Sequence, residues 1–130
     1  MIRALKVALI VWGALHILLG LVLVVVPYQA ASMMGFGEIT DFGVYVAVLW
    51  GAALIAASVW IIGAGRDPLQ HISWVKFVIL LSILGLVVQL YSVVQGAVDF
   101  TQAGVGIIED AVFAIAFLAL YPYRAARGSQ

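Results

Sequence analysis

The sequence predicts an all-α protein of four membrane-spanning helices, and two observations lead to this fold class. The chain of 130 residues is 66% hydrophobic and only 9% charged, whereas about a quarter of an average soluble domain is charged. Its apolar residues gather into four runs, each near the roughly 20 residues that a helix needs to cross a bilayer. Because lipid offers the backbone no hydrogen-bond partners, and the runs lack the alternation of barrel strands, helices are expected. The length predicts a single domain over residues 1–130.

The expected spans cover residues 7–26, 43–62, 75–94 and 104–121. The first run is longer than the apolar core of a signal peptide, and no small-x-small cleavage site precedes Pro27. We therefore expect it to remain as a permanent helix. The segment from Pro27 to Met34 opens with the proline of a first helical turn and is followed by a glycine. Either a short helix lying at the outer interface or an ordinary structured loop fits this segment.

The basic residues predict the orientation of the chain in the membrane. In a four-span protein all six of them fall on one side: Arg3, Lys6, Arg66, Lys76, Arg124 and Arg127. Five of the acidic residues lie toward the other side, and Asp67 alone breaks the segregation. The positive-inside rule then places both termini and the loop between the second and third spans in the cytoplasm. The expected location is the inner (cytoplasmic) membrane.

Small residues mark the faces on which the helices are expected to pack, because they let backbones approach closely. Gly13 and Gly20 share a face of the first span with His16. The second and third spans carry comparable stripes, which consist of Gly43, Ala47 and Gly51, and of Ser82, Gly85, Gln89, Ser92 and Gly96. These stripes either pack the four helices of one chain or recruit another helix, in a homo-oligomer or a larger membrane complex.

Four polar residues in the spans need an explanation: His16, Gln89, Glu109 and Asp110. At about 1.5 Å per residue, Gln89 and the two acids lie at a similar depth, and His16 lies about one turn deeper. Ionisable groups at such depth are costly and are functional candidates. They either converge on a pocket that is open to the outer side and binds a cation, a polar ligand head or a proton, or they lock the bundle by hydrogen bonds.

The two acids are neighbours in the sequence, so their side chains diverge by about 100° around a helix. Asp110 shares its face with small residues such as Gly106 and Ala114, and we expect it to point inward. Glu109 is then expected to point toward a helix boundary or an outer water layer. Alternatively, both acids lie in the first turns of the helix, where the dipole favours negative charge.

Several classes of function are disfavoured by the composition. The absence of cysteine removes disulfides and thiolate metal sites, and zero formal net charge gives no reason to expect nucleic-acid binding. A membrane haem usually needs paired axial histidines and zinc needs three or four ligands, whereas His16 is the single histidine within a span. We therefore expect no cofactor, no metal and no catalytic residue, which favours a non-enzymatic role.

The chain resembles the small bacterial four-helix membrane proteins of the DoxX-like type. The resemblance lies in Trp12-Gly13-Ala14-Leu15-His16 with Gly20, in the Pro27 loop that ends in Gly35-Phe36, and in Leu120-Tyr121-Pro122. Some members of such families are associated with redox or sulfur metabolism. By size the chain is also similar to small multidrug-resistance transporters, but these use a glutamate in the first helix, where this chain has His16.

Three functional hypotheses follow for this lipid-embedded chain. The first is a non-enzymatic accessory or structural subunit, or a binder of a lipid-like ligand. The second is a proton-coupled transporter built around His16, Gln89 and Asp110. The third is a redox-linked protein that contacts quinone through His16 and Trp50.

Overall fold

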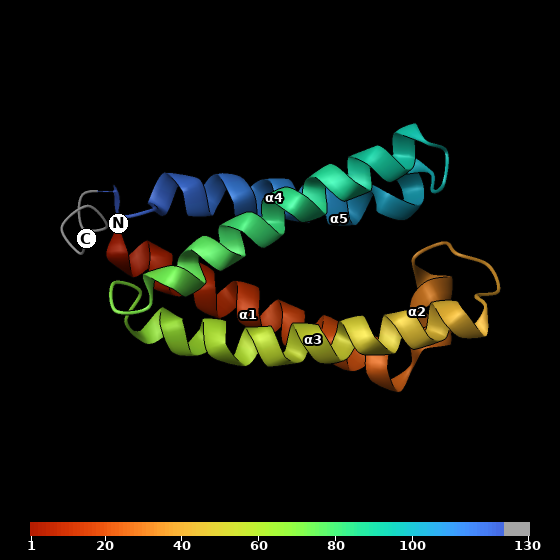
Figure 1. Cartoon of the computed structure of the whole chain (residues 1–130), viewed down its shortest axis with the longest axis horizontal. Helices are drawn as coiled ribbons and strands as arrows, with labels where there is room; N and C mark the ends of the chain where they lie inside the picture. Colours follow the sequence, from red (N-terminus) through yellow and green to blue (C-terminus); the bar gives the residue numbers. More distant parts are fainter. Residues whose placement is uncertain (124–130) are drawn as a thin grey trace.

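The computed structural model describes residues 1–123, and within them the chain forms five helices and no strand. The helices are α1 (Ile2–Val25), α2 (Pro27–Met33), α3 (Asp41–Arg66), α4 (Ile72–Val94) and α5 (Phe100–Leu120) (Figure 1). All but α2 are long and apolar enough to cross a membrane. The expected all-α, four-span fold is confirmed, and the segment after the first span is the short helix α2 rather than a loop. The chain is a multi-pass membrane protein.

The long helices extend beyond the apolar runs that predicted them, because their polar ends continue outside the hydrocarbon region. α1 begins at Ile2 rather than at residue 7, and α3 continues to Arg66. Local signals set several of the ends: the Thr40 side chain accepts a hydrogen bond from the Gly43 amide at 3.1 Å at the start of α3. Gly35 and Gly96 have φ of 81° and 71° after α2 and α4, a conformation that a glycine adopts without steric cost.

The four long helices pack as two hairpins, α1 with α3 and α4 with α5 (Figure 1). Gly20 and Gly51 bring the backbones of α1 and α3 together. A Cβ at Gly20 would lie 2.6 Å from the Gly51 carbonyl oxygen, and one at Gly51 would lie 2.7 Å from the Gly20 carbonyl oxygen. Gly13 also faces α3, and Gly65, which the sequence reading did not include, faces Ile10 of α1.

Other residues of the expected packing stripes contribute differently. A Cβ at Gly43 would meet only Thr40 and Ile39 of its own segment, and Ala47 is half-buried. In α4, Ser82 is buried, whereas the Ser92 hydroxyl donates to the Val88 carbonyl of its own helix at 2.8 Å. The close contact between α1 and α3 therefore passes through Gly51 and not through the first turn of α3.

The apolar core lies in one half of the bundle. Its buried side chains come from the first half of α1 and α4 and the second half of α3 and α5: Leu5, Leu9, Trp12, Ile61, Val75, Val78 and Phe117. We call this half, which contains Met1 and the α3–α4 loop, the N-terminal end. The hairpins converge there and diverge toward the opposite end, which we call the α2 end (Figure 1).

Charged residues separate along the same axis. The basic residues Arg3, Lys6, Arg66 and Lys76 lie at or next to the N-terminal end, together with Asp67. The acidic residues Glu38, Asp41 and Asp99 lie at the α2 end. Arg124 and Arg127, which the sequence predicts on the same side as the other basic residues, fall outside the described residues. The outer faces of the helices are apolar, as a lipid environment requires.

Candidate ligand-binding site

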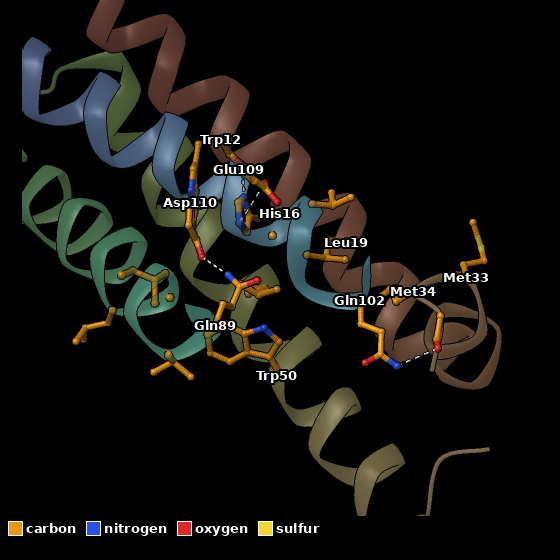
Figure 2. A pocket seen from close by; sticks show the side chains of 18 of the residues that line it. Trp12, His16, Leu19, Met33, Met34, Trp50, Gln89, Gln102, Glu109 and Asp110 are labelled. Atoms are coloured by element: carbon orange, nitrogen blue, oxygen red, sulfur yellow. Dashed lines mark hydrogen bonds and ion pairs between the residues drawn. The ribbon is translucent and has the colours of Figure 1, made fainter. Parts of the chain in front are cut away.

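A cavity of about 830 Å³ lies between the two hairpins, beyond the core and toward the α2 end (Figure 2). Sites for small molecules are typically clefts of roughly 300–1,000 Å³. All four long helices contribute to its walls, and the end of α2 with the residues after it contributes Met33, Met34 and Gly35. The divergence of the hairpins therefore leaves a space large enough for a ligand.

The walls of this cavity are mostly apolar, with a few polar side chains. Leu19, Leu54, Leu84, Val88 and Val105 are among the apolar lining residues. The four polar residues singled out in the spans, His16, Gln89, Glu109 and Asp110, lie near each other in the wall (Figure 2). Thr101 and Gln102 line it separately, in the first turn of α5. Trp50, the remaining residue proposed for a ligand site, lines the same cavity from α3. The structure thus brings all five sequence-derived site residues to one space.

His16 is held in a defined orientation by Trp12, one turn earlier in α1. Its Nδ1 lies 2.9 Å from the Trp12 carbonyl oxygen, and because a carbonyl can only accept, Nδ1 carries the proton. The imidazole also stacks on the Trp12 indole, with ring centroids 3.8 Å apart and planes inclined by 17°. This places Nε2 3.7 Å from Oε1 of Glu109 on α5.

Nε2 of His16 is the ring nitrogen that faces Glu109. With the proton on Nδ1, a neutral imidazole presents the lone pair of Nε2 to the carboxylate oxygen, whereas an imidazolium would present an N–H. His16 and Glu109 therefore face each other between α1 and α5, at 3.7 Å.

Glu109 points toward the boundary between α5 and α1, and a helix boundary was one of the two directions expected for it. Its side chain reaches α1, and both acids line the cavity. The divergence of about 100° between neighbouring positions directs Glu109 toward α1 and Asp110 toward α4. Both directions lead into the cavity because the cavity is bounded by both hairpins.

Asp110 is bound by Gln89 across the α4–α5 contact. The amide Nε2 of Gln89 donates to Oδ2 of Asp110 at 2.6 Å, which is a short hydrogen bond. Two glycines make room for this pair: a Cβ at Gly85 would lie 3.0 Å from Asp110 Cγ, and one at Gly106 would lie 3.0 Å from Gln89 Cδ. Gly85 therefore accommodates a polar side chain rather than a neighbouring backbone.

One polar group beside the cavity has no partner of its own. The indole Nε1 of Trp12 is buried and makes no hydrogen bond within residues 1–123, although Trp12 lines the cavity and is only 1% exposed. Buried donors are almost always paired with protein or water. The Trp12 Nε1 is therefore an unsatisfied buried donor among the described residues. The hydroxyls of Ser58 and Ser82 are likewise buried and unpartnered among the described residues.

Hydrogen bonds of Gln102, which the sequence analysis did not predict, join two segments at the α2 end of the cavity. Gln102 in the first turn of α5 accepts a hydrogen bond from the Asp99 amide at 2.9 Å and donates to the Gly35 carbonyl at 3.0 Å. The first bond completes a capping box, and the spacing of Asp99 and Gln102 is a sequence signal for that motif. The second bond joins the segment after α2 to α5.

A hydrogen bond from Thr101 lowers the pKa of the exposed Asp99 carboxyl.

Two further observations limit what the site can be. Within residues 1–123 no three side chains of His, Cys, Asp or Glu come together as metal ligands would. Comparison with protein-family models, with curated proteins and with solved structures finds no match. The resemblance to DoxX-like proteins stays a prediction, and the function has to be argued from the geometry of the site.

Proposed function

We propose that this chain is a small, non-enzymatic membrane protein that binds an amphipathic, lipid-like molecule in the cavity between its hairpins. The observation that carries the proposal is a cavity of about 830 Å³ with mostly apolar walls and a few polar side chains. Binding sites of this size are usually mostly apolar, with a few polar groups that orient the ligand. An apolar body would lie along Leu54, Leu84 and Val88, and a polar head would reach Gln89 and Asp110.

The polar residues give a reason to prefer ligand binding over a purely structural role. Polar side chains that only hold membrane helices together are expected to face each other within the packed interior. Here His16, Glu109, Gln89 and Asp110 border an open space. A ligand head would complete their hydrogen bonds.

The proposal includes an orientation. We place both termini and the α3–α4 loop in the cytoplasm of the cell, in its inner membrane, so that the mouth at the α2 end faces outward. The support is the excess of basic residues at the N-terminal end, with Arg3 and Lys6 before α1 and Arg66 after α3, by the positive-inside rule. Two reporter enzymes fused to the C-terminus test this, one active only in the cytoplasm and one active only in the periplasm. The cytoplasmic reporter should be active and the periplasmic reporter inactive. Activity of the periplasmic reporter would contradict the orientation.

Native mass spectrometry of the protein, released gently from its own membrane, tests the binding proposal. We expect a reproducible additional mass in the range of a lipid or another small amphiphile. A protein-sized mass would instead support the accessory-subunit hypothesis, and a bare chain under conditions that preserve lipid on other membrane proteins would contradict ligand binding.

Two neighbouring valines of α4 provide a matched pair of variants. Val88 lines the cavity, whereas Val87 does not, and the two side chains are 60% and 55% exposed in the isolated chain. Val88→Trp places a bulky ring in the cavity and should remove the additional mass. Val87→Trp places the same ring on the outer face of α4 and should leave it bound. Equal retention by both variants would mean that the mass is held elsewhere.

A further inference from the structure

The charges around the cavity are unevenly balanced. Its titratable lining groups are His16 from α1 and Glu109 and Asp110 from α5. The lining residues of α3, of α4 and of the segment after α2 contribute no titratable side chain, and no lysine or arginine of residues 1–123 lines the cavity. Two carboxyl groups therefore share one imidazole, and one of the carboxyl groups has no basic partner.

The geometry identifies Asp110 as the carboxyl group without a partner. Glu109 has its Oε1 3.7 Å from Nε2 of His16, which can supply a positive charge. Asp110 is bound by the neutral amide of Gln89 instead, and an amide does not compensate a full negative charge. At membrane depth an uncompensated charge is unfavourable. Asp110 is therefore expected to hold either a proton or a cation.

The remaining hydrogen-bonding capacity of the site is mainly that of an acceptor. One N–H of the Gln89 amide is used on Oδ2 of Asp110, and its second N–H remains as a donor. Oδ1 of Asp110, the amide oxygen of Gln89 and one oxygen of Glu109 are acceptors without a hydrogen-bond partner among the described residues. The indole of Trp50, which is 49% exposed in the isolated chain, also borders the cavity, and indole faces attract organic cations. These features suit a positively charged head group.

We infer that the molecule bound in this cavity carries a positively charged head, and that the head replaces a proton on the Asp110 carboxyl group. This inference rests on the proposed function, since it assigns a chemical class to the same ligand. In the exchange the O–H bond of Asp110 breaks, the proton passes to water at the mouth, and the cation takes its place beside the carboxylate. The total charge of the site is unchanged, so the exchange avoids leaving a charge uncompensated in lipid.

The test uses the full chain in phosphatidylcholine nanodiscs and two probes with similar apolar bodies. Tetraphenylphosphonium is a permanent cation with no exchangeable proton, and triphenylphosphine oxide is neutral. Binding of the cation should release about one proton per molecule into weakly buffered solution, as read by a pH indicator. Because the cation displaces a proton, the Kd of the cation should fall by up to about tenfold for each unit by which the pH rises, over the range in which Asp110 holds its proton. The neutral probe should bind more weakly and release none.

Two variants assign the proton. Asp110→Asn keeps the shape and the contact with Gln89 but has no titrating carboxyl group, so the proton release and the pH dependence should disappear. Asp41→Asn removes an exposed acid at the start of α3 that does not line the cavity, and it should behave as the unmodified chain does. If Asp110→Asn fails to fold, the pH dependence of the unmodified chain alone decides.

The outcomes separate this inference from the proposed function. Saturable binding of both probes with equal affinity, no proton release and no pH dependence from about pH 4 to about pH 8 would overturn the cationic head and leave amphiphile binding intact. The absence of saturable binding by either probe would also overturn the inference. The native-mass experiment then decides the proposed function by itself.

Discussion

Gly20 and Gly51 mark a close approach of the α1 and α3 backbones that a single added methyl group can test. In Gly51→Ala the new Cβ would lie 2.7 Å from the Gly20 carbonyl oxygen and 2.9 Å from Leu23 Cβ. Ordinary contact begins at 3.4 Å, so the two helices must separate by about 0.7 Å. Overpacking of this kind typically costs about 1–3 kcal/mol, and we expect the free energy of unfolding to fall by that amount.

Gly63 provides the control for this substitution in the same helix. A Cβ at Gly63 would meet nothing within 4 Å, so Gly63→Ala adds a methyl group without a clash. Its expected effect is between zero and a gain of about 1 kcal/mol from helix propensity. Titration of micelle-bound protein with sodium dodecyl sulfate, followed by circular dichroism, measures both variants.

A double-mutant cycle strengthens the test. Gly20→Ala and Gly51→Ala disturb one contact, so the double variant should lose less stability than the sum of the two single losses. Full additivity would mean that the two glycines act independently. Equal stability of Gly51→Ala and Gly63→Ala would refute the close packing of α1 on α3.

Three further predictions follow from single side chains. Gln102→Ala removes the hydrogen bond to the Gly35 carbonyl. Hydrogen–deuterium exchange should therefore become faster in residues 34–37 and stay unchanged where α1 packs on α3. An unchanged exchange rate in residues 34–37 would contradict the connection between this segment and α5. Ser58→Ala removes a fully buried hydroxyl that has no partner among the described residues. The free energy of unfolding should therefore stay the same or rise by up to about 1 kcal/mol. A loss of several kcal/mol would show that the hydroxyl has a hydrogen-bond partner. The hydrogen bond from Thr101 lowers the pKa of Asp99 in the folded chain, so the stabilisation by its charge is complete above the unfolded value near 3.9 and is lost as the pH falls through the lower folded value. Thermal melting should therefore show a lower Tm for Asp99→Asn than for the unmodified chain near neutral pH, with the difference closing at low pH; a difference that does not depend on pH would contradict this account.

The fold class followed from the sequence because crossing a membrane leaves a strong signal in composition. Long apolar runs must form helices in lipid, and the four predicted runs correspond to α1, α3, α4 and α5. The ends of the helices were less well predicted, since hydropathy marks only the part of a helix that lies in the hydrocarbon. Capping signals such as Asp99 with Gln102 locate the true ends.

The site was only partly predictable. Depth along each helix suggested that His16, Gln89 and the two acids lie near each other, because the rise per residue is constant. The choice between the two directions expected for Glu109 was not predictable, because it depends on how far the hairpins diverge, and that is a property of tertiary packing. The role of Gly85 was hidden for the same reason: its spacing fits helix packing, but it faces the Asp110 carboxyl group.

The central claim is that an amphipathic molecule occupies the space between the hairpins with its head at Gln89 and Asp110. Crystals grown in a lipidic phase with alkyl probes brominated at the tail, one with an ammonium head and one with a hydroxyl head, test it most directly. We expect an anomalous bromine peak within the cavity, beside the apolar wall formed by Leu54, Leu84 and Val88, for at least one probe. Bromine peaks confined to the outer faces of the helices, with the hairpins packed together and no cavity between them, would contradict it.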